Sequence, residues 1–580
     1  MAVTGNAFDF SILKRILSYV KPYKKVFYFT ALVTVLLAFL SPIRPFIVQY
    51  AIDNYVIKTN PIGLLNAVLI MLGVLIIESL LQFSSSYYAN FLGQNVIKDL
   101  RVQLYKHILN FKSKYFDNNA VGTLVTRTIS DIQTIVDVFS QGFLEIIGDI
   151  LKLIVIITVM FVSDWRLSII SLSTIPILLI ATNIFKNAIK KSFQDVRNQV
   201  ARLNAFVQEH ITGMMIVQIF NKEHDEFEKF KAINEEHKQA NIRSIWHYSV
   251  FFPVVEILSA ISIGLLVWWG SKEALKDTFT LGSIVSFIMY VNLLFRPIRQ
   301  LADRFNTLQM GMVSSERVFK ILDAQDEIKN SGKIDATNIK GKIEFKNVWF
   351  AYIDENWVLK NISFTIEAGQ TIALVGATGS GKSTIINLIN RSYEINKGEI
   401  LIDDIPLQQY ELGSLRQNVG MVLQDVFLFS DTIKNNITLN NPLIKDNAIE
   451  EASKIVGADN FIKKLPLQFD YNVMERGATL SVGQRQLLAF VRSYVYNPKI
   501  FILDEATSSI DTESEQLIQK ATEIITKNRS SIVVAHRLST IQKADKIYVM
   551  QLGEILESGS HNELLQQNGH YKNLFNLQYQ

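Results

Sequence analysis

The sequence contains no cysteine, which excludes disulfide bonds, thiol catalysis and thiolate metal sites. Charged residues are also scarce, at 19% of the chain, whereas a typical soluble domain carries about 25%. The net charge is only +4, so no global excess of positive charge points to a nucleic-acid partner. The first apolar run is too long for a signal-peptide core, and we expect insertion through the first spanning helix itself.

Hydrophobic residues are abundant instead: they make up 49% of the chain, and the mean hydropathy is positive. Part of the chain is therefore expected to lie in lipid, and 580 residues suggest several structural units. An amphipathic helix is predicted over Phe8–Val20, on the cytoplasmic interface. Six runs near the roughly 20 residues that span a bilayer follow it. They are Val26–Val48, Leu64–Phe83, Phe143–Val162, Leu167–Phe185, Tyr248–Trp269 and Leu281–Phe295.

Positive charge predicts the orientation of these spans. It is concentrated before the first span, between spans two and three, and between spans four and five. The other loops are short and carry only Lys58, Arg166, Lys272 and Lys276. The positive-inside rule therefore places both termini and both long polar segments in the cytoplasm. The long segments keep helical periodicity, so they are predicted to be cytoplasmic extensions of the spanning helices.

Several ionisable residues fall inside the spans: Arg44, Glu78, Glu145, Asp149 and Glu256. A charge at mid-bilayer costs about 2.5–3.5 kcal/mol on insertion scales, so such groups usually face a cavity or a partner. Two interpretations remain open. The residues line a transport pathway, or Arg44 pairs structurally with an acid while Glu145 and Asp149 lie at the cytoplasmic interface.

The chain turns polar from Asp323 to Gly341, and short β-rich runs then alternate with helical stretches. This pattern predicts an all-α membrane domain over residues 1–322, a linker over 323–341 and an α/β domain over 342–580. The α/β domain contains a strand–loop–helix with the phosphate-binding P-loop pattern. The loop residues are Gly376, Ala377, Thr378, Gly379, Ser380, Gly381, Lys382, Ser383 and Thr384.

In this loop, backbone N–H groups would surround phosphate oxygens, Lys382 would reach the outer phosphates, and Ser383 would offer a hydroxyl to Mg²⁺. A strand ending in Asp504 and Glu505 supplies two carboxylates. Asp504 is placed to hold Mg²⁺ through water, and Glu505 to orient or deprotonate the attacking water. Gln424 follows another strand, and its side-chain amide is suited to contact both Mg²⁺ and the attacking water.

Two further residues are more ambiguous. Tyr352 precedes the strands that lead to the loop, where it would stack on adenine or simply pack in the sheet. His536 follows a buried strand and is either structural or close to the phosphates. Leu480–Gln486 opens a helix with a serine and a glycine, which predicts a second phosphate site. One nucleotide has no obvious use for two such sites from one subunit.

The ordered set of Tyr352, the P-loop, Gln424, Leu480–Gln484, Ile500–Glu505, Asp511 and His536 resembles the ATP-binding cassette motif for motif. Six spans ahead of it resemble the half-transporter arrangement of ABC exporters. The resemblance implies a cassette with a helical subdomain that pairs head to tail with a second one, so that Ser481, Gly483 and Gln484 of one subunit complete the ATP site of the other.

The same resemblance implies that Asp511 lies between the two sites and that His536 contacts the γ-phosphate. It also implies that Glu475–Gly477 senses the membrane domain, and that turns near residues 120–127 and 209–217 are coupling helices. Two departures stand out: Val482 and Met474 occupy positions where the family usually has glycine. Because valine tolerates positive φ poorly, Val482 is expected to have ordinary helical or extended dihedrals.

These observations predict an ATP hydrolase, with ATP and Mg²⁺ as cofactors, that exports or flips drugs or lipids across the bacterial inner membrane. The expected partner is a second half-transporter, with a homodimer favoured over a heterodimer. The substrate would be a hydrophobic or amphipathic small molecule or lipid. An ATP-gated channel or a regulatory membrane subunit is the alternative, and an intact Glu505 weighs against it. An importer is disfavoured because its cassette usually forms a separate chain.

Overall fold

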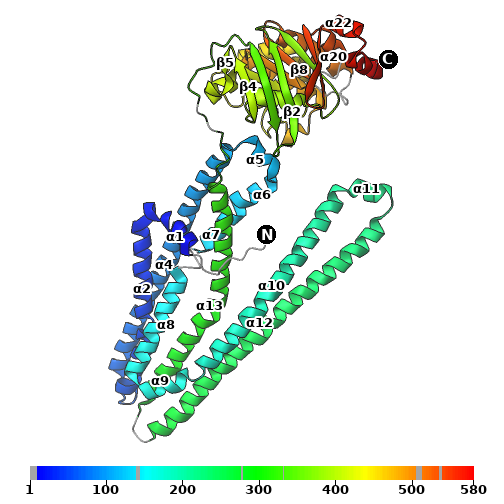
Figure 1. Ribbon diagram of the computed structural model, residues 1–580. Coiled ribbons are helices and arrows are strands. Elements are labelled where there is room, and N and C mark those ends of the chain that lie inside the picture. The colour runs from blue at the N-terminus through cyan, green and yellow to red at the C-terminus, as the bar shows by residue number, and fades with distance from the viewer. Residues whose placement is uncertain are drawn as a thin grey trace. The chain divides into compact units, whose positions relative to one another are not determined.

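The computed structural model describes residues 10–138, 144–275, 279–328, 330, 332–504, 512–534 and 538–579. The chain divides into two compact units, one helical and one α/β (Figure 1). The helical unit comprises Met1–Leu109 and Val121–Ala324, and the α/β unit comprises Asn110–Ala120 and Gln325–Gln580. A short piece of the first long polar segment therefore belongs with the α/β unit.

Six helical stretches of the helical unit are long and apolar enough to cross a membrane. They are Lys21–Val56, Pro61–Leu109, Glu145–Ser163, Trp165–Thr212, Glu223–Ala274 and Leu281–Ile298. Each contains one of the six predicted spans or all but its first residues, which confirms the six-span prediction. The second, fourth and fifth of these stretches, at 49, 48 and 52 residues, continue far beyond the bilayer-spanning length, as the periodicity of the long polar segments predicted.

The helices of this unit are as follows: α1 (Phe10–Ser18), η1 (Lys21–Tyr23), α2 (Lys24–Leu40), α3 (Ile43–Ala51), η2 (Ile52–Val56), α4 (Pro61–Leu109), α6 (Val121–Thr126), η3 (Arg127–Asp131), α7 (Ile132–Asp137), α8 (Leu144–Ser163), α9 (Trp165–Leu172), α10 (Ile175–Thr212), α11 (Met214–Ile219), α12 (Glu223–Ala274) and α13 (Leu281–Leu322). Local chemistry sets several boundaries. The Asp164 carboxylate accepts the backbone N–H groups of Arg166 and Leu167 and so begins α9. Gly213 separates α10 from α11.

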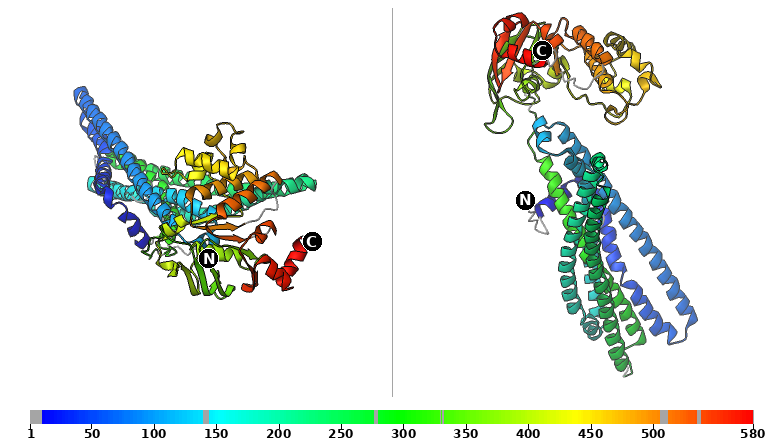
Figure 2. Two further views of the ribbon diagram at one scale, coloured as in Figure 1. Left: turned by 90° about the horizontal axis from the view of Figure 1, so that it is seen from above. Right: turned by 90° about the vertical axis from the view of Figure 1, so that its right-hand side faces the viewer.

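Helix α13 packs against α3, α7, α8 and α12, whereas α10 and α12 run side by side over most of their length. This long pair diverges from α13 toward the short helix α11 at its tip (Figures 1 and 2). The tip carries large apolar side chains that a single chain leaves uncovered: Met215, Ile216, Ile219 and Phe220 are all more than 60% exposed. Apolar clusters of this kind usually mark an interaction surface.

The α/β unit contains two sheets. The strands are β1 (Ile343–Ala351), β2 (Trp357–Ile366), β3 (Thr371–Val375), β4 (Lys397–Ile402), β5 (Ile405–Pro406), β6 (Val419–Val422), β7 (Ile500–Asp504), β8 (Ser530–Val534), β9 (Lys546–Gln551) and β10 (Glu554–Gly559). One sheet is antiparallel, in the order β2-β1-β4-β5. The other has the order β10-β9-β3-β8-β7-β6, and all its neighbouring strands are parallel except β10 and β9.

The helices of the α/β unit are α5 (Ser113–Asn118), α14 (Lys382–Ile389), η5 (Leu407–Gln409), α15 (Leu412–Asn418), α16 (Ile433–Thr438), α17 (Asp446–Val456), α18 (Asp459–Ile462), η6 (Gln468–Asp470), η7 (Glu475–Gly477), α19 (Val482–Tyr496), α20 (Thr512–Thr526), α21 (Leu538–Gln542), α22 (His561–Gln566) and α23 (His570–Tyr579). Helices α16 to α19 lie between β6 and β7 in sequence.

Strand β3 is buried on both faces, as its continuous apolar sequence predicts. Ile372 and Leu374 join a core shared with the antiparallel sheet and α14. Ala373 and Val375 join the opposite core, which includes apolar residues of α17, α19 and α20. The mixed α/β architecture agrees with the predicted fold class.

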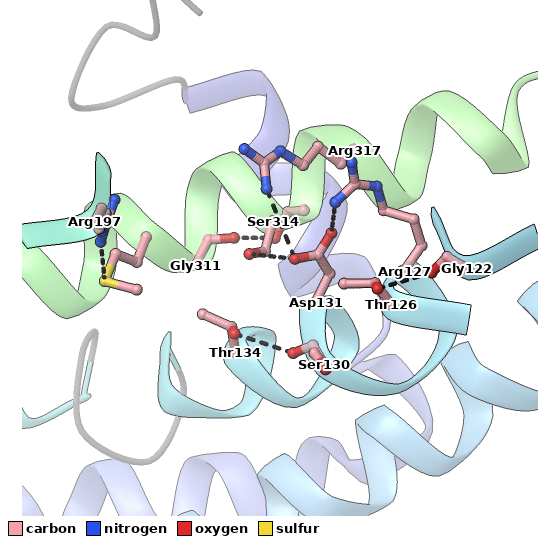
Figure 3. Close-up of polar contacts among 12 residues, drawn as sticks. Gly122, Thr126, Arg127, Ser130, Asp131, Thr134, Arg197, Gly311, Ser314 and Arg317 are labelled. Carbon is pink, nitrogen blue, oxygen red and sulfur yellow. Dashed lines mark hydrogen bonds and ion pairs between the residues drawn. The ribbon is translucent and has the colours of Figure 1, made fainter. Parts of the chain in front are cut away.

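The buried carboxylate of Asp131 is the centre of a polar cluster that links two helices of the helical unit (Figure 3). Its Oδ2 accepts from Arg127 Nη1 at 2.5 Å, and its Oδ1 accepts from Ser314 Oγ at 3.2 Å. Arg317 Nη1 lies 3.9 Å from Oδ1. Arg127 and Asp131 belong to the π-helix η3, whereas Ser314 and Arg317 belong to α13. The cluster therefore links η3, which follows α5 and α6 in the chain, to α13, which precedes the α/β unit.

Candidate nucleotide-binding site

The P-loop follows β3 and opens α14, as the sequence predicted. Gly379 and Gly381 have φ values of 83° and 103°, in the left-handed region that favours glycine. A Cβ on Gly376 would lie 2.2 Å from the Met550 carbonyl oxygen, so only glycine lets the loop pass there. These glycines shape a backbone turn of the kind that encloses phosphate.

Lys382 is buried beneath this loop. Its Nζ donates to the carbonyl oxygens of Gly376 and Ala377 at 2.8 and 3.0 Å. Burial lowers the pKa of the Lys382 amine, and the nearby Asp504 carboxylate partly opposes that shift. A desolvated cation inside a loop of glycines gains strongly from a bound anion, so the observed residues fit a nucleotide phosphate.

Ser383 and Asp504 come together at the end of the loop. Ser383 Oγ donates to Asp504 Oδ2 at 3.2 Å, although the residues lie on α14 and β7. A hydroxyl and a carboxylate are oxygen ligands of the type that Mg²⁺ prefers. The pair was predicted from the sequence as part of a metal site, and its geometry fits that ion.

The sheet register brings Asp504 and Gln424 to the same edge of the sheet. Asp504 pairs with Val534 of β8, and Val422 of β6 pairs with Leu503 of β7. Gln424 follows β6 two residues beyond that pair and is exposed. Carboxyl ends of neighbouring parallel strands meet at one sheet edge, which is where ligands of such sheets bind. Three of the predicted residues, Glu505, Asp511 and His536, lie outside the described residues.

Tyr352 lies directly beside the P-loop helix. Its hydroxyl is 3.1 Å from Thr384 Oγ1, and its ring packs edge-on against Tyr393, with centroids 5.1 Å apart. Tyr393 in turn donates a hydrogen bond to Asp117 of α5. Sequence reasoning missed both Tyr393 and Asp117, because nothing in a linear pattern signals a contact between residues so far apart in the chain.

The serine of the second predicted phosphate site begins helix α19. Ser481 Oγ accepts from the Gln484 backbone N–H at 3.2 Å, and Gln484 Oε1 accepts from the Ser481 N–H at 3.0 Å. This is a capping box. Val482 is the first helical residue and Gly483 is buried behind it, so Val482 has ordinary dihedrals as expected. The departure at this position therefore leaves the helix N-terminus intact.

Met474 behaves differently. Its φ of 59° and ψ of −174° lie in a backbone region that residues other than glycine rarely adopt. Arg476 also has a positive φ, of 54°, one residue before Gly477. The loop from Met474 to Gly477 therefore keeps a glycine-type backbone although a methionine occupies its first position.

Four of the five ionisable residues predicted in the spans fall into two clusters. Arg44 Nε lies 2.9 Å from Glu78 Oε2, which is the structural pairing that was one of the two open interpretations. Arg304 of α13 pairs with both Glu145 and Asp149 of α8. Arg304 was missed from the sequence, since it lies in the stretch after the last predicted span. The second cluster also lines a polar cavity of about 100 Å³ with Ser85, Ser86 and Lys152.

Comparisons with known proteins agree with this architecture. A model of the ABC transporter transmembrane region matches residues 27–298, and a model described as ABC transporter matches residues 359–508. The chain belongs to the ABC transporter family. It carries one membrane domain and one cassette, so it is a half-transporter, a multi-pass membrane protein with an ATP-binding domain of the ATP-hydrolysing type.

Similar proteins cover essentially the whole transporter. YknV of Bacillus subtilis, named as an ABC transporter ATP-binding protein, is 37% identical over 100% of this chain and 96% of its own. Exp8 of Streptococcus pneumoniae, with the same kind of name, is 34% identical over 98% of each chain. A Staphylococcus aureus protein, whose name provisionally assigns it to multidrug export ATP-binding/permease proteins, is 35% identical over 98% of this chain and 100% of its own.

Proposed function

We propose that this half-transporter works as a dimer that exports or flips a hydrophobic or amphipathic compound, with ATP hydrolysed at sites shared between the two cassettes. The observation that supports a shared ATP site is the presence of two separate elements in one chain that are each of a type that binds phosphate. Lys382 lies in the P-loop, whereas Ser481 begins a different helix and makes its hydrogen bonds within that helix. In this proposal each ATP lies between the P-loop of one subunit and the Ser481 helix of the other.

Within one subunit, Lys382 and the backbone N–H groups of the loop bind the phosphates, and Tyr352 stacks on the adenine. Ser383, Asp504 and Gln424 would hold Mg²⁺, which when bound neutralises part of the phosphate charge. Glu505 accepts a proton from the attacking water or orients it, and His536 contacts the γ-phosphate. Electrostatic stabilisation of this kind is the main part of phosphoryl-transfer catalysis.

From the second subunit, Ser481, Gly483 and Gln484 complete the phosphate site, and Asp511 lies between the two sites. The cytoplasmic side of the membrane holds both termini and the cassette, and two identical chains form the favoured dimer. Exposed apolar side chains support a second subunit in both units: those of α11 in one, and Phe427 and Phe429 in the other, at 54% and 58% exposed.

The proposed substrate class rests on the multidrug-export name of one relative and on the apolar surface of the spans. The polar cavity beside Asp149 and Lys152 supports a substrate with a polar group on an apolar body. An ATP-gated channel remains the alternative. Accumulation of substrate against its gradient in inverted vesicles, dependent on ATP, separates a pump from a channel.

A mixed dimer tests the shared site. Lys382→Ala and Ser481→Ala chains with different affinity tags are expressed together, and dimers carrying both tags are isolated. If each site is shared, both lesions fall in one site and the other stays intact, so the mixed dimer keeps measurable ATPase activity while both homodimers lose it. If each subunit had its own complete site, both sites of the mixed dimer would be damaged. If the ATPase activity of the mixed dimer is as low as that of the two mutant homodimers, the proposal is overturned.

A further inference from the structure

The polar cavity of the helical unit, of about 100 Å³, is lined by residues of α2, α4, α8 and α13. Gly148 of α8 permits the close packing at this place, because a Cβ there would lie 2.6 Å from Thr34 Cγ2 of α2. Sites for whole small molecules typically measure about 300–1,000 Å³. This cavity is well below that range, so it has room for one polar group of a ligand rather than for a complete drug-sized molecule.

Both carboxylates of the cavity wall already have a cation beside them. Arg304 Nη2 lies 3.0 Å from Glu145 Oε2, and Arg304 Nη1 donates to Asp149. A third carboxylate whose charge reaches the cavity, that of Glu78, is paired with Arg44. A cationic ligand would therefore have to displace an arginine from its carboxylate.

Lys152 differs, because it lines the cavity and forms no ion pair with a carboxylate of the described residues. It lies near the middle of the span Glu145–Ser163, where a charge is costly and normally faces a cavity or a counter-charge. The charge of Arg296 also acts on Lys152, and Arg296 likewise forms no ion pair within the described part of the chain. Four cations therefore face three carboxylates in this region, which leaves a surplus of one positive charge.

The uncharged part of the wall supplies further hydrogen-bond donors. Ser79 and Ser84 of α4 lie outside the cavity, and each donates to the carbonyl oxygen four residues earlier in its own helix. Ser86 and Gln82 of the same helix line the cavity, and their side chains make no hydrogen bond with any other described residue. An ammonium group, a hydroxyl and an amide NH₂ thus border one small space, and all three can donate to an anion.

We propose that this cavity binds the acidic group of an amphipathic substrate: a single negative charge, as on a carboxylate, a sulfonate or a phosphodiester, attached to an apolar body. Lys152 determines the specificity, Ser86 and Gln82 donate to the same group, and the start of the apolar body lies against Leu37 and Ala89, which also line the cavity. This inference rests on the proposed export function and adds the charge of the substrate to it.

Photoaffinity labelling without nucleotide tests the site independently of transport. The full-length protein is placed in phosphatidylcholine nanodiscs, and a hexadecane sulfonate that carries a diazirine in its chain is compared with the matching hexadecanol. Relative to the other spans, the sulfonate is expected to label α4 and α8 at least about threefold more than the alcohol does. Lys152→Gln should remove this difference and Lys152→Arg should retain it. Lys272→Gln, which changes an exposed lysine of α12, should leave it unchanged.

Competition then identifies the source of the acidic group. Suppression of the sulfonate-specific labelling by phosphatidylglycerol in the nanodisc, with labelling of the other spans as the reference, would show that a lipid headgroup fills the cavity. Suppression by unlabelled hexadecanoate alone would show that the ligand is a single-chain amphiphile. Both outcomes agree with a site for one acidic group.

Equal relative labelling by the sulfonate and the alcohol would overturn the proposal, and so would a native ratio in Lys152→Gln, because bilayer depth is the same for all variants. If Lys152→Gln does not fold, the comparison of the two probes on the native protein decides alone.

Transport of the sulfonate is measured separately, as ATP-dependent transfer to the luminal leaflet of inverted vesicles. Lys152→Gln is expected to lower this transfer severalfold, and Lys272→Gln to leave it at the native level. Equal transfer by Lys152→Gln and the native protein would overturn the role of the cavity as a substrate site. If no compound is transferred although the labelling depends on Lys152, the export function is contradicted while the binding site itself is supported.

Discussion

Tyr393 and Asp117 form a hydrogen bond although 276 residues separate them in the chain. Asp117 lies on α5, which belongs to the α/β unit although the chain before and after it belongs to the helical unit. The Tyr393 ring also packs at 89° to that of Tyr352, beside the P-loop helix. Within the α/β unit, helix α5 is therefore connected to the proposed adenine site through the Tyr393 side chain.

Tyr393→Phe should weaken this connection without disturbing the ring packing. The lost hydrogen bond is worth about 1 kcal/mol, and burial with the Asp117 contact raises the pKa of the native phenol, so the hydroxyl stays protonated as a donor. We expect ATP affinity close to that of the native protein and reduced stimulation of ATPase activity by substrate. Both are measured on the purified protein in nanodiscs.

Tyr115→Phe is the control for this prediction. Tyr115 lies on the same helix α5, and its ring packs at a tilt of 37° against that of Phe111, with centroids 4.1 Å apart. Removing its hydroxyl should leave the stimulation unchanged. Weaker ATP binding with intact stimulation in Tyr393→Phe would contradict the assigned role.

Met474→Gly should stabilise the cassette. A residue other than glycine at a φ of 59° and ψ of −174° costs about 1–3 kcal/mol in backbone strain. Glycine removes that cost, but the greater entropy it gives the unfolded chain lowers the free energy of unfolding by about 0.4–1 kcal/mol. The net gain of about 1 kcal/mol corresponds to a rise of about 2–4 °C in the melting temperature of a domain of this size. Met474→Ala keeps the strain, so equal melting temperatures for the two variants would contradict the interpretation.

The features of this protein differ in how clearly the sequence signals them. The six spans and the P-loop were predictable because hydropathy and a nine-residue motif are local properties of the chain. The unusual position of Met474 was also visible, but its positive φ was not, because a side chain of ordinary type gives no sign of the backbone that surrounding structure imposes on it.

Contacts between distant segments were not predictable from one sequence. The first coupling turn was expected near residues 120–127, whereas the structure groups Ser113–Asn118 with the cassette and Val121–Thr126 with the membrane domain. Both stretches are helices of only six residues, so periodicity does not distinguish them. The pairing of Arg304 with Asp149 likewise depends on helix packing rather than on spacing.

The ion pair of Arg44 and Glu78 supports a structural role for both residues. Glu78→Gln leaves an arginine in a span without a counter-charge, a situation that costs about 2.5–3.5 kcal/mol on insertion scales. We expect a lower melting temperature and a lower yield in the membrane. The double variant Arg44→Gln/Glu78→Gln removes both charges and should recover most of the stability and the transport activity. A stable double variant without transport would instead place the pair in the substrate pathway.

Asp131 gives the last prediction, because its three partners contribute unequally (Figure 3). Arg127 lies at 2.5 Å and is largely buried, whereas Arg317 lies at 3.9 Å with 45% of its side chain exposed. Asp131→Asn keeps the shape and the Ser314 contact but removes the charge. The expected loss of stability is about 2 kcal/mol, between the values for exposed and fully buried ion pairs.

The two arginines provide matched controls for this estimate. Arg127→Gln should destabilise the protein nearly as much as Asp131→Asn, because it leaves a buried carboxylate with only a distant cation. Arg317→Gln should cost less than about 1 kcal/mol, since a half-exposed pair at long range is weak. Thermal unfolding of the three variants in one detergent checks the order. Because this cluster joins the chain leaving α5 to the helix that leads into the cassette, Asp131→Asn should also lower substrate-stimulated ATPase activity more than basal activity. Equal effects on the two activities would show that the cluster only stabilises the fold.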